Sequence, residues 1–492
     1  MQRKVYLETF GCQMNVLDSQ LVLSQLRAHG YEQTEDFEQA DVILYNTCSV
    51  RDHAEQKVWS RLGELRNAHR KRPDLVIGVM GCMAEREGAG LFVKYPHVDV
   101  LCGPAELDKL PAMVHNAVVA RCSAGDFRPK RQVALMGSNG RRSSTLDAAQ
   151  DTLELLDLSR TVSPGDDLAQ AYVRVTRGCN KFCTYCVVPY TRGPEVHRPP
   201  QNIIDEVRKL VDGGAREVTL LGQTVNHYAY QHGDGRVTSF ADLLYMIHEA
   251  TPDLPRLRFV TSFPRDFTDE ALMAMRDCPR ICRYLHVPAQ SGSDRMLRAM
   301  NRGYTSGQYI EFIDRARAMM SDISIASDFI VGFPTETEED HQATLELLRR
   351  CRFKNSFIFK YSPRPGTIAI KRFEDDVPDE TKRRRNNEAL AVQQAISAEL
   401  NRAMIGKIVE VMVEGESKLV SKQSRPGHVE LGWERRNTAA EEKTQLVGRT
   451  RGDQVVCFDG PSSLKGQILQ VEITDAHQMT LFARIVEPVV AS

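Results

Sequence analysis

Three cysteines each follow a short apolar run in the first hundred residues. The runs VYLETFGC, VILYNTC and LVIGVMGC end at Cys12, Cys48 and Cys82, and a helical pattern follows each of them. One cysteine at such a junction is ordinarily a small apolar filler, but three in the same position indicate a shared role. Structural zinc usually has four protein ligands, and no local histidine supplies the fourth. The three thiolates therefore predict a four-iron, four-sulfur (4Fe-4S) cluster with one iron left open.

A second cysteine group lies in the segment VTRGCNKFCTYCVVPYTRG. Cys179, Cys183 and Cys186 have the spacing C-x3-C-x2-C and directly follow a strand pattern. Three thiolates on one tight loop bind three corners of a 4Fe-4S cluster. Zinc fingers use pairs of C-x2-C, and no second pair follows here. We therefore predict a second cluster, whose fourth iron stays free for a small-molecule ligand.

Alternating strand and helix patterns in residues 1–122 must position the first group. Such βα repeats build a parallel sheet with right-handed crossovers. In open α/β sheets, ligands bind beyond the carboxyl ends of the strands. If the three strands are neighbours, Cys12, Cys48 and Cys82 converge at one edge of this domain.

The rest of the chain divides into three further segments. Residues 123–168 are polar and rich in turn residues, and we interpret them as a long, partly mobile linker with one short helix inside it. Residues 169–402 contain six βα units, which predict a partial barrel with its active site at the strand ends. Residues 403–488 lose the helical period and show five short β runs, at 407–417, 428–433, 455–460, 466–476 and 479–487. The predicted fold class is α/β, with an N-terminal parallel-sheet domain, a central partial (βα)6 barrel and a small C-terminal β-barrel.

Composition bears on location and partners. The net charge of −1 neither demands nor excludes a nucleic-acid partner. No stretch reaches the about 18 apolar residues of a membrane span, and the N-terminus lacks the apolar region of a secretory signal. We therefore expect a cytoplasmic protein that does not contact a membrane. Reducing compartments keep thiols free, so patterned cysteines indicate metal ligands. We interpret the other six cysteines as ordinary thiols: Cys102, Cys122, Cys278, Cys282, Cys351 and Cys457.

The second cysteine loop is similar to the signature of the radical SAM (S-adenosylmethionine) superfamily. With a three-cysteine α/β domain before it and a small β-barrel after it, the chain resembles the methylthiotransferases of that superfamily. The resemblance covers essentially everything except residues 123–168 and includes NTCSVRDHAEQKV, GCMAER, LLGQTVNHY, HVPAQSGSDRMLRAMNRGYT, SDFIVGFPTETEED and YSPRPGT. Residues 49–52, SVRD, resemble the MiaB branch, which acts on transfer RNA (tRNA), whereas the RimO branch, which modifies a ribosomal protein, more usually has Gly-Phe there. The terminal barrel resembles the RNA-binding TRAM domain.

The resemblance implies two 4Fe-4S clusters, SAM and a reaction in two stages. One SAM donates a methyl group to sulfur held at the first cluster. A second SAM, cleaved at the second cluster, yields a radical that takes hydrogen from C2 of an N6-isopentenyladenosine in tRNA, and the methylthio group joins that carbon. This C–H group has no acidic proton, so a cofactor must supply the chemistry, and no catalytic side chain beyond the cluster ligands is expected. The implied partners are tRNA, a low-potential electron donor of flavodoxin or ferredoxin type and a sulfur donor, and we expect a monomer.

Residues near the strand ends are candidate SAM contacts on the same resemblance: Tyr185, Gly222, Gln223, Gln290 and Ser291. Gly222 and Gln223 are also consistent with a plain turn, and Gln290 and Ser291 with a phosphate contact or with no ligand at all. His286, within a strand, is interpreted as a satisfied core histidine. Three residues depart from the family pattern. Phe263 stands where histidine is common, Thr224 where asparagine is common and Thr335 where glycine is common.

The sequence is also consistent with other functions. The same chemistry on a ribosomal protein side chain or on another modified tRNA adenosine is one alternative, and a non-catalytic iron–sulfur RNA-binding protein is another. The RNA contacts are equally open. The basic run Arg383–Arg385 is either a solvated face or a phosphate contact, and Trp433 and Phe458 either stack on bases or belong to the core.

Overall fold

Six parallel strands form the N-terminal sheet in the computed structural model, which describes residues 2–49, 52–122, 131–136, 153–161, 169–417 and 443–486. The order across the sheet is β2-β1-β3-β4-β5-β6. The strands are β1 (Arg3–Phe10), β2 (Tyr31–Gln33), β3 (Val42–Thr47), β4 (Val76–Gly81), β5 (Val100–Cys102) and β6 (Gln132–Ala134). The helices between them are α1 (Gln13–Ala28), α2 (Asp52–Lys71), α3 (Cys82–Glu87), α4 (Leu91–Lys94) and α5 (Leu110–Cys122). The strand order reverses between β1 and β3, which is where such sheets bind ligands.

Helices cover both faces of this sheet. Strands β3 and β4 are buried along their whole length, as apolar central strands of a doubly covered parallel sheet are. One apolar core lies between the sheet and helices α1 and α5, and a second core lies between the sheet and α2, α3 and α4. Because both faces of the sheet are filled, the strand ends are where we expect a ligand to bind.

Two described pieces of residues 123–168 belong to the N-terminal domain. Residues 132–134 form β6, which extends the sheet by pairing with β5. Residues 153–158 are helical, as expected, and Leu153 and Leu156 join the core beside α1. Strand β6 was not expected, because its three residues are too few to show a period. The other residues of this segment lie outside the described part, so the domain boundaries at 122 and 169 stay a prediction.

The six βα units of the central domain are present. The parallel strands are β7 (Gln170–Arg174), β10 (Glu217–Leu221), β13 (Arg256–Val260), β14 (Tyr284–His286), β15 (Ser324–Val331) and β16 (Asn355–Lys360). They form two three-stranded sheets, which meet at a bridge between Leu257 and Ile281. The outer helices are α8 (Pro200–Asp212), α9 (Phe240–Ala250), α10 (Asp269–Asp277), α11 (Asp294–Ala299), α12 (Ser306–Met319), α13 (Glu338–Cys351) and α15 (Asp379–Arg402). The prediction of a partial barrel is confirmed.

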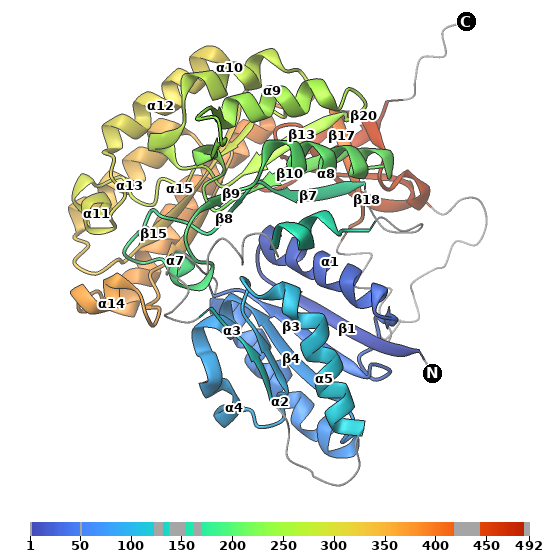
Figure 1. Cartoon of the computed structure of the whole chain (residues 1–492). Helices are drawn as coiled ribbons and strands as arrows, with labels where there is room; N and C mark the ends of the chain where they lie inside the picture. Colours follow the sequence, from blue (N-terminus) through green and yellow to red (C-terminus); the bar gives the residue numbers. More distant parts are fainter. Residues whose placement is uncertain are drawn as a thin grey trace, which may run out of the picture.

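Helix α1 of the N-terminal domain packs against the inner face of the barrel. Figure 1 shows α1 directly beneath β7, and Leu221 of β10 is buried in the same core as Leu17 and Leu21 of α1. The carboxylate of Asp18 on α1 pairs with two buried guanidinium groups of the barrel, Arg174 at 3.0 Å and Arg192 at 2.9 Å. These contacts bring the N-terminal domain against the mouth of the barrel.

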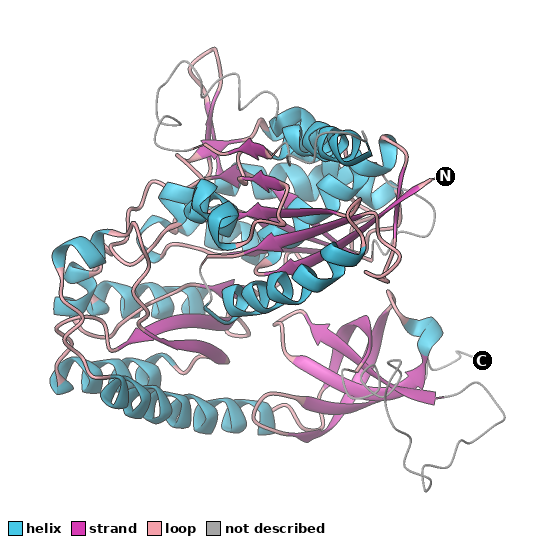
Figure 2. Ribbon diagram, turned by 90° about the horizontal axis from the view of Figure 1, so that it is seen from below, coloured by secondary structure: helices cyan, strands magenta, loops and turns pink. Residues whose placement is uncertain are grey.

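The C-terminal domain is a closed barrel of five strands in the order β17-β18-β19-β21-β20 (Figure 2). Its strands are β17 (Ile408–Glu416), β18 (Lys443–Thr450), β19 (Val455–Pro461), β20 (Ile468–Ala476) and β21 (Leu481–Ile485). Four of the five expected runs are strands, whereas the expected run at 428–433 lies outside the described residues. The fifth strand is β18, which was not expected because polar residues and a glycine interrupt its apolar pattern.

The small barrel is attached to the start of the central strands. The fully buried guanidinium of Arg256 donates to the carbonyl of Arg449 at 3.0 Å and to that of Thr450 at 2.7 Å. Lys354 pairs with Asp453 at 2.9 Å. None of the helices in the described ranges is long and apolar enough to cross a bilayer.

Candidate functional site

The first cysteine group gathers at one edge of the N-terminal sheet. Strands β1, β3 and β4 are neighbours, and their register aligns Phe10 with Thr47 and Thr47 with Gly81. Cys48 and Cys82 each follow that row by one residue, and Cys12 follows it by two. The structure therefore brings the three predicted ligands together.

Glycines make this close approach possible. A side-chain carbon on Gly11 would lie 2.8 Å from the Cβ of Cys48, so only glycine fits there. Gly81 has a φ of +93°, and an added carbon would lie 2.7 Å from the carbonyl oxygen of Thr47. Both glycines immediately precede a predicted ligand, which explains why the pattern Gly-Cys occurs twice within this group.

Two buried asparagines support the first group, and the sequence analysis did not identify them. The side-chain amide of Asn15 donates to the side-chain carbonyl of Asn46 at 2.8 Å, and the amide of Asn46 donates to the backbone carbonyl of Asn15 at 2.8 Å. The thiol of Cys12 donates to the carbonyl oxygen of the Asn15 side chain at 3.3 Å. The asparagines in CQMN and YNTC were the available signal, because a buried asparagine needs partners.

A buried arginine from the central domain lies beside the first group. Arg192 follows the short helix α7 (Val188–Thr191), which packs against α3, the helix that begins at Cys82. Burial lowers the pKa of Arg192, but the charges of Cys82, Asp18 and Cys12 outweigh it, and the pKa is raised well above its usual value. In turn, the pKa of Cys12 is lowered to about 6, chiefly by a hydrogen bond with Cys48 and also by Arg192. The hydrogen bond with Cys48 and the guanidinium of Arg192 thus favour the thiolate of Cys12.

The second cysteine group lies on one loop closed by two short antiparallel strands, β8 (Thr176–Arg177) and β9 (Val196–His197). Gly178 has a φ of +65°, and an added carbon would lie 1.9 Å from the carbonyl oxygen of Pro194. The backbone N–H of Cys179 donates to the carbonyl of Gly193 at 3.1 Å. Burial raises the pKa of Cys179 to about 11 and raises that of Cys186 as well. Without a metal, these thiols keep their protons.

Arg302 holds the second loop against the barrel. Its guanidinium donates to the sulfur of Cys183 at 3.5 Å and to the hydroxyl of Tyr185 at 3.4 Å. The same group donates to the carbonyl of Pro288 at 2.7 Å and to the hydroxyl of Tyr304 at 2.9 Å. Tyr185, a predicted SAM contact, therefore has its hydroxyl bonded to Arg302 and packs against the core of the barrel.

Phe263 replaces the histidine that is common in the family, and it lies directly under this arginine. The guanidinium carbon of Arg302 is 4.5 Å from the ring centre of Phe263, which is buried. This geometry is a cation–π contact between Arg302 and Phe263.

Gly222 and Thr224 lie next to the second loop. A carbon on Gly222 would lie 2.3 Å from the hydroxyl oxygen of Thr176, which is buried and has no partner among the described residues. The hydroxyl of Thr224 donates to the carboxylate of Glu195 at 2.6 Å. Gln223, between them, is half-buried. Gly222 allows this close packing, and the unpartnered hydroxyl of Thr176 is a buried polar group that a polar ligand such as SAM would satisfy.

The segment after β14 adopts a strained turn. Gln290 has a φ of +72°, and its backbone bonds on both sides to β15. The hydroxyl of Ser291 is buried and lies 3.3 Å from that of Thr344, so it is engaged within its own loop. His286 pairs with Asp328 at 3.0 Å, in agreement with the expectation of a satisfied histidine.

Two exposed phenylalanines line the inner face of the last strands. The register pairs Phe357 with Asp328 and Phe359 with Ile330, while Ile358 between them packs toward the helices. Phe357 is 45% exposed and Phe359 is 41% exposed, and their rings lie parallel at 6.4 Å. The sequence analysis did not identify this aromatic wall, because alternation in a strand does not reveal which face opens to solvent.

Other candidate residues are engaged in packing or ion pairs. Arg383 pairs with Asp379, Arg384 with Glu338, and the buried Arg385 with Glu336. These contacts favour a structural role over phosphate binding. Phe458 is buried in the core of the small barrel, which excludes the stacking role, and Trp433 lies outside the described residues. Thr335, where glycine is common, has a φ of +68°. Cys102, Cys278, Cys282 and Cys351 are buried and Cys457 is half-buried.

Family models match three parts of the chain. Residues 173–348 match the radical SAM superfamily, and residues 435–486 match the TRAM domain. Residues 4–103 match the family described as "Uncharacterized protein family UPF0004". The three matches fall within the three structural domains.

The chain is also similar to solved and curated proteins. A radical SAM methyltransferase, TsrM from Kitasatospora setae, shares the fold, with a TM-score of 0.52 at 14% identity over 75% of this chain and 74% of that one. A protein of Rhodopirellula baltica named tRNA-2-methylthio-N(6)-dimethylallyladenosine synthase is 44% identical, over 99% of this chain and 96% of its own. One of the same name from Neisseria gonorrhoeae is 40% identical over 99% and 100%. With this identity over nearly its whole length, the chain belongs to the tRNA-2-methylthio-N(6)-dimethylallyladenosine synthase family of the radical SAM superfamily.

Proposed function

We propose that this enzyme adds a methylthio group to C2 of N6-isopentenyladenosine next to the anticodon of tRNA. The observation that carries the proposal is the proximity of the two cysteine groups. Arg192 lies six residues after Cys186 in the sequence, and its guanidinium interacts electrostatically with Cys82 and Cys12 of the first group. Six residues span at most about 20 Å, and α7 shortens the path further. Two clusters at this separation can act on one substrate.

Each group of cysteines offers three thiols, which leaves one iron of a 4Fe-4S cluster without a protein ligand. Cys12, Cys48 and Cys82 would hold the first cluster, beside a guanidinium that helps to lower the pKa of Cys12. Cys179, Cys183 and Cys186 would hold the second. The clusters and SAM supply the methyl transfer and the radical cleavage of the C–H bond when they are bound.

The protein itself orients the reactants and excludes water. Arg302 fixes the loop around Cys183, and the unpartnered hydroxyl of Thr176 beside Gly222 would contact a polar group of SAM. The wall of Phe357 and Phe359 is the apolar, stacking surface that an adenine with an isopentenyl group would need. Replacing Phe359 with alanine should raise KM for tRNA about tenfold with little change in SAM cleavage, since one base stack contributes about 1–3 kcal/mol.

The proposed partners are tRNA, a low-potential electron donor and a sulfur donor, in the cytoplasm. The TRAM barrel would bind RNA outside the active site, because all six cysteines lie before it in the chain. Truncation after Arg402 should therefore keep SAM cleavage but flatten the salt dependence of tRNA binding. Filter binding at two salt concentrations measures this, and an unchanged slope would assign RNA binding to another surface.

The direct test is mass spectrometry of tRNA nucleosides from cells that lack the gene. The methylthiolated nucleoside should disappear and its N6-isopentenyl precursor should accumulate. The wild-type gene should restore the product, whereas Cys48→Ala and Cys183→Ala should not. Purified Cys48→Ala should still cleave SAM, while Cys183→Ala should not. An unchanged nucleoside profile, together with a mass loss from a ribosomal protein, would support the alternative substrate instead.

A further inference from the structure

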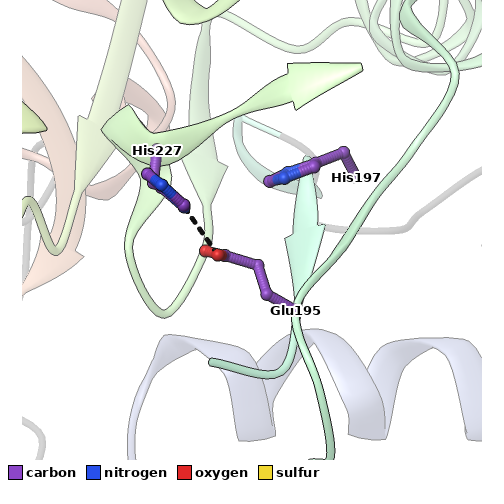
Figure 3. A group of neighbouring side chains, drawn as sticks. All are labelled: Glu195, His197 and His227. Atoms are coloured by element: carbon purple, nitrogen blue, oxygen red, sulfur yellow. Dashed lines mark hydrogen bonds and ion pairs between the residues drawn. The ribbon is translucent and has the colours of Figure 1, made fainter. Parts of the chain in front are cut away.

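A group of three side chains that could ligate a metal ion lies beside the cysteine loop and contains no cysteine. One ligand atom each from Glu195, His197 and His227 lies within 4.8 Å of the others. Figure 3 shows Glu195 and His197 on one short segment, that of β9, with His227 approaching from a neighbouring segment. His227 ends a single helical turn, Val225–His227, that follows β10. The function proposed above uses none of these three side chains.

The carboxylate of this cluster is held in place. The side chain of Glu195 is 2% exposed, and one carboxylate oxygen accepts from the hydroxyl of Thr224 at 2.6 Å. The other oxygen lies 2.6 Å from Nδ1 of His227. The backbone N–H of Glu195 donates to the side chain of Asn180 at 3.1 Å, within the cysteine loop. These are the outer contacts that orient a metal-binding carboxylate.

The second histidine has a nitrogen with nothing to bind. Nδ1 of His197 is buried and has no hydrogen-bond partner among the residues that the structure describes. Buried polar atoms nearly always have a partner, so this atom calls for an explanation. Its ring meets the rings of His227 and Tyr228 edge-on, at 6.1 and 5.6 Å. A cation shared with Glu195 would satisfy the free nitrogen.

We propose that Glu195, His197 and His227 bind one divalent transition-metal ion of the zinc class, apart from the six cysteines. Two imidazoles and one carboxylate suit Zn²⁺ or Fe²⁺, whereas Mg²⁺ and Ca²⁺ prefer oxygen ligands alone. The side chain of His227 is 42% exposed, which gives the ion a path from solvent. On binding, Nδ1 of His227 gives up its proton and coordinates the ion, and Nε2 takes up a proton from solvent, so that the imidazole stays neutral.

The bound ion would join two segments of the candidate active site. Glu195 is hydrogen-bonded to Asn180 of the cysteine loop and to Thr224. Thr224 follows Gly222, which packs closely against Thr176, by two residues. The ion would therefore stiffen the rim on which the proposed SAM site is built. Metal binding itself does not depend on the proposed function, and it is measured without RNA.

The test uses the full-length chain with both clusters reconstituted under anaerobic conditions, so that the cysteines are occupied. Loosely bound metal is removed with a chelator, and Zn²⁺ is titrated against a fluorescent zinc indicator. Wild-type protein should bind one more zinc ion than the double variant His197→Ala/His227→Ala. His227→Asn, a change at an exposed position, should weaken this zinc at least about 100-fold, because the loss of even an outer contact weakens metal binding about 10–100-fold.

His232→Ala is the matched control. His232 lies near the cluster in sequence and bonds to the hydroxyl of Thr238, but it is not part of the group. Its loss should leave the zinc stoichiometry unchanged. Iron and sulfide contents equal to wild type establish that each variant is folded. Equal zinc binding by wild type and His227→Asn, or equal weakening in His232→Ala, would overturn the proposal.

Discussion

The two cysteine groups reach the same ligand set by different routes. Cys12, Cys48 and Cys82 come from three separate strand ends and meet only when β1, β3 and β4 are in register. Residues 179–186 place their three cysteines on one loop, closed by the short pair of β8 and β9. The first site therefore depends on the whole sheet, whereas the second depends on local turns and one arginine.

The two groups also differ in electrostatics. The hydrogen bond from Cys48, together with Arg192, lowers the pKa of Cys12 to about 6. Burial raises the pKa of Cys179 to about 11. We therefore expect Cys12 to be a thiolate before iron arrives, whereas Cys179 must lose its proton to iron. Since each group has its own three thiols, we expect the two sites to load independently.

Removal of one whole group tests this independence most strongly. Replacement of Cys179, Cys183 and Cys186 by alanine should leave about four of about eight irons and abolish SAM cleavage. The physical reason is that no residue of one group serves the other. Iron and sulfide analysis after anaerobic reconstitution measures the result. Loss of all iron would show that the two sites are not separate.

Replacing Arg192 and replacing Arg302 should each affect a different cysteine group. Arg192→Met removes a partner from the fully buried Asp18, which should destabilise the fold by about 3 kcal/mol and selectively deplete iron from the first site. Arg302→Met should instead deplete the second. Denaturant unfolding of each variant measures its stability. Iron analysis is done on each variant after the cysteines of the other group are also replaced by alanine, so that the iron of one site is counted alone. If both variants lose iron equally from both sites, the assignment of one arginine to each site is wrong.

Alkylation of iron-free protein compares the thiols directly. At pH 7 most of Cys12 is thiolate, whereas Cys179 is almost entirely protonated. Because intrinsic nucleophilicity falls with pKa, the expected ratio of alkylation rates is about 100-fold in favour of Cys12. As pH falls through about 6, the rate at Cys12 should fall with it. Peptide mass spectrometry after timed iodoacetamide treatment gives both rates, and equal rates at pH 7 would contradict the electrostatic difference.

The smallest expected effect is the difference in stability between alanine variants of the glycines that precede the two cysteine groups. Gly178→Ala should destabilise the protein more than Gly11→Ala, by about 1–2 kcal/mol, because only Gly178 also has a left-handed backbone. Its added carbon would meet a backbone oxygen, whereas that on Gly11 would meet side-chain atoms. Thermal or urea unfolding of both variants measures the difference. An equal loss of stability would mean that the loop at Gly178 relaxes freely.

Much of this architecture was predictable from local patterns. The six βα units follow from alternating strand and helix periods, and each predicted ligand lies at the end of a recognisable strand or on a recognisable loop. Strands β2 and β6 were missed because three residues show no period. Strand β18 was missed because polar residues and a glycine interrupt its pattern. The interpretation of 123–168 as a linker overlooked its contribution to the N-terminal core.

The sequence by itself determined which residues we predict to bind iron, because thiol chemistry and spacing are properties of the chain. It also determined the order of the domains, because each has its own hydrophobic period. Only the tertiary structure decided which groups surround those thiols. Arg192 reaches the first site through the docking of α7 on α3, and Arg302 reaches the second although it lies 116 positions after Cys186 in the sequence. His197 and His227 meet for the same reason, since contacts between distant segments depend on packing and leave no local period.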